Sequence, residues 1–138
     1  MGTVACREPR RRLERCVNIR EAEILEYARH LPQEDAADVI GRVKFGRSWK
    51  SLAREGESER QAAYRVGALI DRVESPRFRF VAQNCGNWPR LMRLVSQMAI
   101  LFGRGQEDVA SELGVSHSQV RKAESMIEGA LAHERSRR

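Results

Sequence analysis

Residues 106–120 have the sequence QEDVASELGVSHSQV, in which two short helical patterns flank a glycine. Val109, Leu113 and Val120 recur at helical spacing and predict an apolar side that the two helices share. Gly114 permits the left-handed backbone that a tight turn between them needs. The stretch therefore predicts a helix-turn-helix, in which two helices cross steeply and the start of the second projects outward.

An earlier copy of this pattern lies 57 residues upstream. Leu31-Pro32 and Trp88-Pro89 each open a segment, and Phe-Gly-Arg follows at 45–47 and again at 102–104. If the first copy lacks one turn residue, the alignment continues through three further pairs: Gly56 with Gly114, Ser58 with Ser116, and Gln61 with Gln119. Similarity at a fixed period is typical of tandem structural units.

Composition favours an all-α fold with two tandem helix-turn-helix units of three to four helices each. The 138 residues suit one compact domain or two small ones, and 6% aromatic with 32% charged residues is typical of amphipathic helices. Glu74-Ser75-Pro76 breaks the helical pattern between the copies. The expected organisation is a basic arm at 1–20, a first unit at 21–74, a second unit at 77–132 and a basic tail at 133–138.

Proline and glycine punctuate both copies in the same way. Pro32 and Pro89 predict helix starts, and Gly46 and Gly103 predict the ends of those helices. The other helices are expected at about 21–30, 48–55, 59–73, 77–84, 106–113 and 117–132. Ser58 and Ser116 are the predicted N-caps of the two longer helices.

The net charge of +6 favours a polyanionic partner, and the excess lies at the two ends. Residues 1–20 hold six arginines against two glutamates, and residues 131–138 hold three arginines against one glutamate. We expect Arg10, Arg11 and Arg12 to contact DNA phosphates from a flexible arm. The alternative is that the arginine-rich ends only keep the protein in solution.

The second copy resembles the C-terminal helix-turn-helix of bacterial sigma factors, the region 4 type, in its Leu-Gly-Val-Ser turn at 113–116 and QVRKAE at 119–124. The first copy resembles it through FGRSW at 45–49 and LARE at 52–55. The resemblance covers about residues 28–73 and 85–131. It implies a helix that binds a promoter element in the major groove and a domain that contacts RNA polymerase. The chain has no room for the promoter-melting domain, so complete sigma factor activity is not expected.

Mapping the reading positions of that family onto this sequence selects two sets of DNA-binding residues. The second copy supplies Ser116, His117, Ser118, Gln119, Arg121 and Lys122, and the first supplies Glu59, Arg60, Gln61, Tyr64 and Arg65. Glutamine can bridge the N6 and N7 edge of adenine, and arginine or lysine can reach guanine or a phosphate. The alternative is a solvated helix face in each copy. The first copy has no apolar residue where the second has Val115. A further alternative is therefore that the first copy does not read bases and is a packing or dimerising unit.

The sequence favours a sequence-specific, DNA-binding transcriptional regulator acting on double-stranded DNA. The alternative is an adaptor that binds RNA polymerase or another regulator without base contacts, because residues 21–130 hold 16 basic and 16 acidic residues. Two alternatives stay open for the oligomeric state. Both units could read DNA, so that a single chain spans two half-sites, or one unit could pair two chains into a dimer.

Other classes of protein are not expected. Cys6, Cys16 and Cys85 match no metal motif and are interpreted as reduced thiols of a cytoplasmic protein. The scattered histidines add no ligand cluster, so neither a metal nor a cofactor is expected. The chain has no glycine-rich phosphate loop and no HExxH motif, so an enzyme is not expected. The longest apolar run, Met98 to Phe102, is too short for a membrane span.

Overall fold

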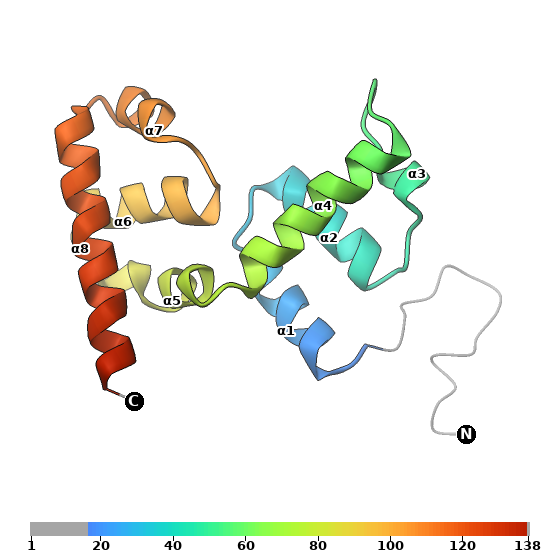
Figure 1. The fold of residues 1–138 in the computed structure, drawn as a ribbon, viewed down its shortest axis with the longest axis horizontal. Coiled ribbons are helices and arrows are strands. Elements are labelled where there is room, and N and C mark those ends of the chain that lie inside the picture. The colour runs from blue at the N-terminus through green and yellow to red at the C-terminus, as the bar shows by residue number, and fades with distance from the viewer. Residues whose placement is uncertain (1–16, 138) are drawn as a thin grey trace. The chain divides into compact units, whose positions relative to one another are not determined.

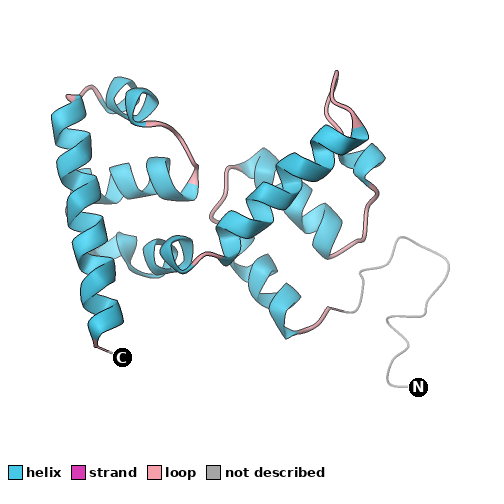
Figure 2. Ribbon diagram, in the orientation of Figure 1, coloured by secondary structure: helices cyan, strands magenta, loops and turns pink. Residues whose placement is uncertain are grey.

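The computed structural model describes residues 17–137, and every regular element in this range is a helix. Figure 1 shows their order along the chain, and Figure 2 shows helices and loops without a strand in the described range. The all-α fold expected from composition is therefore confirmed. The chain divides into two compact units between Glu74 and Ser75.

The first unit has four helices: α1 (Ile19–Ala28), α2 (Gln33–Val43), α3 (Trp49–Leu52) and α4 (Glu59–Glu74). The longest of them, α4, packs against the other three. Its apolar stripe is buried, and the side chains at the centre of the unit are Ile24, Val39, Ala62, Val66 and Val73.

The second unit has α5 (Pro76–Asn84), η2 (Cys85–Asn87), α6 (Arg90–Ser96), η3 (Gln97–Leu101), α7 (Gln106–Leu113) and α8 (His117–Ser136). α6 continues directly into η3, a π-helical turn. α8 packs against α6 and α7, and η3 packs against α5. The fully buried side chains of this core include Phe78, Val81, Val95, Val109, Val120 and Ile127.

The helices that follow Pro32 and Pro89 end in the same way, α2 before Gly46 and the continuous α6–η3 helix before Gly103. Gly46 has φ +66° and Gly103 has φ +72°, the left-handed conformation that glycine adopts without strain. The N–H of the following arginine donates to the carbonyl six residues earlier, at 3.0 Å in the first copy and 2.9 Å in the second. The Schellman helix ending has the corresponding hydrogen bond over five residues, so both of these endings are one residue wider than that motif. Both predicted glycine stops are confirmed.

Two helix boundaries differ from the expectation for local reasons. α1 begins at Ile19, before residue 21, because Asn18 and Glu21 form a capping box at its start. α8 continues to Ser136, so the expected tail at 133–138 is helical as far as Ser136. Residues 132–136 contain neither glycine nor proline, and nothing in the sequence ends the helix there.

Candidate nucleic-acid interface

The start of α8 is fixed by an apolar junction with α7. Val109 and Val120 are 0% exposed, and Gly114 ends α7 with φ +67°. Leu113, the third predicted anchor, is only half-buried. The predicted junction is therefore confirmed at both valines and in part at Leu113. The buried valines fix the direction in which α8 leaves the turn.

Ser116 and Gln119 close a capping box at the start of α8. The Oγ of Ser116 accepts from the N–H of Gln119 at 3.2 Å, and the Oε1 of Gln119 accepts from the N–H of Ser116 at 3.0 Å. The N-cap predicted at Ser116 is confirmed. The bidentate contact to adenine expected for Gln119 needs both its side-chain oxygen and its nitrogen. In this structure the oxygen accepts from the N–H of Ser116, so Gln119 positions the helix, and its contact with adenine stays a prediction.

The remaining four residues of the predicted set lie together on the first two turns of α8. His117, Ser118, Arg121 and Lys122 are all exposed. Residues four apart on a helix are neighbours, which places His117 beside Arg121 and Ser118 beside Lys122. None of these side chains has a hydrogen bond or ion pair with the described part of the chain. They are available to an external partner, and two of them are permanently cationic at neutral pH.

α4 begins with the same cap in the first unit. The Oγ of Ser58 accepts from the N–H of Gln61 at 3.1 Å, and the Oε1 of Gln61 accepts from the N–H of Ser58 at 2.8 Å. The predicted N-cap at Ser58 is confirmed, and Gln61 is a positioning residue like its counterpart. Glu59, Arg60 and Tyr64 lie at the surface, with Tyr64 78% exposed.

The prediction that Arg65 faces outward is wrong. Its guanidinium donates to Asp38 at 2.6 Å and to both carboxylate oxygens of Glu57, at 2.9 and 3.0 Å. A fourth bond reaches the carbonyl of Leu52 at 3.2 Å. The side chain is 22% exposed, so these bonds are partly shielded from water. Arg65 holds α2, α4 and the turn between α3 and α4 together and is not available to bind bases.

An ion-pair network replaces apolar packing at this point of the first unit. Asp38, Glu57 and Arg65 align with Val95, Val115 and Ala123 of the second unit. Val95 and Ala123 are buried, and Val115 is half-buried. Two related helix junctions therefore use different chemistry. In the first unit, the N–H of Arg54 also donates to Glu57 at 2.9 Å, so the chain leaves the helical conformation early. As a consequence α3 covers only Trp49–Leu52, whereas residues 48–55 were expected to be helical.

Protonation of Glu57 is expected to destabilise the first unit at acidic pH. The hydrogen bonds from Arg65, and next that from the Arg54 N–H, lower the pKa of Glu57 from its ordinary 4.5 to about 2. A carboxylate with a lowered pKa stabilises the fold above its unfolded-state pKa, and the contribution is lost as pH falls toward its folded-state pKa. We expect Glu57→Gln to lower the melting temperature at neutral pH, and the gap to the parent to close between pH 4.5 and about 2.

Thermal unfolding across this pH range provides the measurement, with Glu55→Gln as the control. Glu55 lies in the same turn, is exposed and has no ion-pair partner among the described residues. A gap for Glu57→Gln that stayed constant with pH would contradict the assignment.

The two units differ in net charge. Residues 17–74 contain ten basic and eleven acidic residues, whereas residues 75–137 contain nine basic and six acidic residues. Of the described chain, the second unit is therefore the part that favours a polyanion. Arg10, Arg11 and Arg12, the predicted phosphate contacts, lie outside the described residues.

Between residues 17 and 137, no group of three or more histidine, cysteine, aspartate or glutamate side chains could hold a metal ion. The same range contains no helix that is long and apolar enough to cross a membrane. Comparison with protein-family models, with curated proteins and with solved structures gives no match to this chain. The candidate interface therefore rests on its own geometry.

Proposed function

We propose that the chain is a sequence-specific, DNA-binding regulator of transcription, built from two tandem helix-turn-helix units of the sigma factor region 4 type. The second unit places the first two turns of α8 in the major groove, which is about 12 Å wide and admits a helix. One observation carries this proposal. The start of α8 is held by the fully buried Val109 and Val120, while four neighbouring polar side chains on it are exposed and unpaired.

The exposed residues divide by chemistry into base and phosphate contacts. Arg121 and Lys122 can donate to guanine or to phosphate oxygens, and His117 and Ser118 can hydrogen-bond to base edges. The capping box at Ser116 fixes the angle at which this set enters the groove, because it orders the first turn of the helix.

The first unit does not bind bases in this proposal. Arg65 and Gln61 are engaged within the unit, and Glu59 would place a negative charge against the DNA backbone. Residues 17–74 also have one more acidic than basic residue. The chain therefore has one DNA-reading helix, and its target is a single short sequence.

Selection of binding sequences from a random pool of duplex DNA tests the proposal. We expect the purified full chain to enrich one short motif. If the chain is a monomer, the motif should lack a second half-site at a fixed spacing. Absence of any enriched motif would contradict sequence-specific binding. If a variant with both Arg121 and Lys122 replaced enriched the same motif, the assignment of base contacts to α8 would be contradicted.

Replacing Arg10, Arg11 and Arg12 by alanine is expected to weaken binding to all DNA sequences alike. Each phosphate contact contributes about 0.9 to the slope of log affinity against log salt, so the slope should fall by about 3. Affinity measured over a range of salt concentrations, on the selected motif and on a scrambled duplex, provides the test. A variant with the slope of the parent would show that these arginines do not contact phosphates.

A second candidate function is an adaptor that binds RNA polymerase through the first unit. The near-neutral charge of residues 17–74 favours it, because surfaces that bind protein need no cationic excess. Co-purification with RNA polymerase from cell extract, with and without nuclease, separates the two candidates. Polymerase that remains bound after nuclease would support the adaptor, and loss of polymerase after nuclease would contradict it.

A further inference from the structure

The solvent face of α4 in the first unit carries no charged residue over its two middle turns. On the side opposite the buried Ala62, Val66 and Leu69, the helix presents Arg60, Ala63, Tyr64, Gly67, Ala68 and Asp71. Only the first and the last of these are charged, and Tyr64 is 78% exposed. The side of a helix that meets water is normally polar, so this face has the composition of a surface that packs against another.

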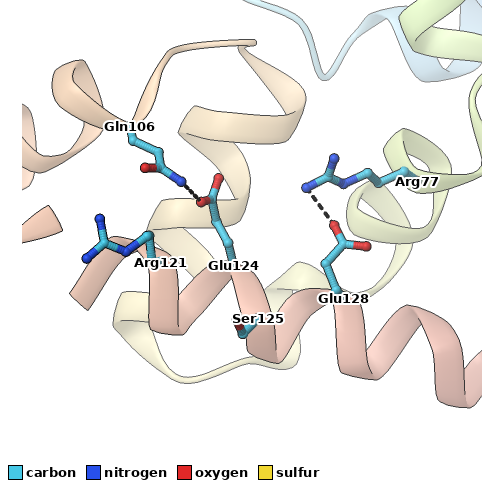
Figure 3. A pocket seen from close by; sticks show the side chains of 6 residues that line it. All are labelled: Arg77, Gln106, Arg121, Glu124, Ser125 and Glu128. Carbon is cyan, nitrogen blue, oxygen red and sulfur yellow. Dashed lines mark hydrogen bonds and ion pairs between the residues drawn. The ribbon is translucent and has the colours of Figure 1, made fainter. Parts of the chain in front are cut away.

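The aligned face of α8 has different chemistry. It holds two cations and two hydroxyl groups among Ser118, Arg121, Lys122, Ser125, Met126 and Gly129. Figure 3 shows two members of this set, Arg121 and Ser125, without a bond to the other side chains drawn. The two long helices thus share a fold, but only α8 presents a cationic surface. The α4 face therefore needs a partner other than a polyanion.

Gly67 lies at the middle of the α4 face, where a second helix could approach closely. A Cβ at this position would meet no atom within 4 Å, so packing inside the unit does not require a glycine. Glycine in the interior of a helix is unfavourable relative to other residues. The large side chain of Tyr64 lies one turn before this position on the same face. A large side chain beside a position without one is self-complementary when two copies of the helix run antiparallel.

We propose that α4 pairs with α4 of a second copy of this chain, antiparallel and around a two-fold axis. In this arrangement Tyr64 packs over Gly67 of the second copy, and Ala63 packs against Ala68 of the second copy. The first unit is then a dimerising unit. One helix face per copy is a small interface, so we expect a weak, reversible dimer that forms above the concentrations used for DNA selection. This inference does not depend on DNA binding.

The charged ends of the face fix the direction of the pair. Neither Arg60 nor Asp71 has a hydrogen bond or salt bridge among the described residues, although Asp71 attracts Arg20, which is bonded to Glu74. Positions 60 and 71, 63 and 68, and 64 and 67 share one midpoint in α4, so the antiparallel pair places each Arg60 across from Asp71 of the other copy. A parallel pair would bring like charges together.

Sedimentation velocity of the full chain without DNA, from micromolar to millimolar concentration, tests the proposal. We expect the parent to pass from monomer to dimer in this range. Gly67→Gln should raise the dissociation constant about 10-fold or more, because the new side chain occupies the place of Tyr64 of the second copy. It should also raise the melting temperature, so loss of the dimer would not come from unfolding. Gly129→Gln is the matched control and should keep the dimer, because Gly129 lies inside α8 and a Cβ there also meets nothing within 4 Å.

Exchanging the charges tests the direction and the identity of the partner. Arg60→Glu and Asp71→Arg each place like charges together at both ends of the pair, so each variant alone should stay monomeric where the parent dimerises. Both changes suit the helix dipole, so the fold should be kept. An equimolar mixture of the two variants restores opposite charges at both ends and should dimerise. The proposal is overturned if the parent stays monomeric, if Gly67→Gln dimerises like the parent, or if the mixture dimerises no better than its components.

Discussion

Replacing Arg121 and Lys122 together by alanine is expected to lower affinity for the selected DNA motif by about 100-fold or more. A lost base contact costs about 1–3 kcal/mol, and a lost phosphate contact reduces the salt slope by about 1. Both side chains are exposed at the start of α8 and have no partner within residues 17–137. Fluorescence anisotropy with the selected and a scrambled duplex measures both affinity and sequence preference.

The matched control is the double replacement of Lys50 and Arg60 by alanine in the first unit. Both residues are exposed, neither has a partner in the described part of the chain, and the control removes the same charge. We expect it to cause a small loss that is equal for both duplexes. If the two double variants lost affinity equally, net charge would explain the binding, and the assignment of α8 as the reading helix would be wrong.

Replacing Val120 by aspartate is expected to unfold the second unit. Val120 is 0% exposed and lies at the junction of α7 and α8, so the new carboxylate would be buried without a partner. Effects above about 4 kcal/mol are typical of such buried charges, and a small domain is stable by only about 5–15 kcal/mol. Amide hydrogen exchange should show lost protection along α8, while amides of α4 remain protected.

Ser118→Asp is the control for this variant, because it adds the same charge two residues earlier on the exposed side of α8. An acidic residue in the first turn of a helix interacts favourably with the helix dipole, so the fold should be kept. Unchanged protection of α8 in Val120→Asp would show that this valine is not part of the core and that the junction does not hold the helix.

Most of the helical framework could be predicted from local signals in the sequence. The glycine stops at 46 and 103 and the caps at Ser58 and Ser116 depend on residues within one or two turns, and all of them are found in the structure. Burial of Val109 and Val120 follows from helical periodicity alone. The glycine stops and the serine caps recur at aligned positions of the two copies, and this recurrence supports each prediction.

The errors lie where a side chain has partners that periodicity cannot identify. The position of Arg65 in its helix predicts an exposed side chain, but its partner Asp38 lies 27 residues away in the sequence. The alignment contained a usable signal, since Asp38, Glu57 and Arg65 together replace three aliphatic residues of the second copy. Charged residues at three aligned core positions are expected to pair with each other. Phe102 ends the longest apolar run of the sequence but is 36% exposed, because it lies at the end of the helix before Gly103.

Nuclear magnetic resonance titration of the isotope-labelled full chain with the selected duplex tests the central claim most directly. If the start of α8 enters the major groove, the amides of residues 116–122 and the side-chain signals of Arg121 should shift most, and those of residues 59–65 should stay nearly constant. Shifts concentrated in α4, or shifts of equal size throughout both units, would contradict the claim that α8 is the DNA-reading helix.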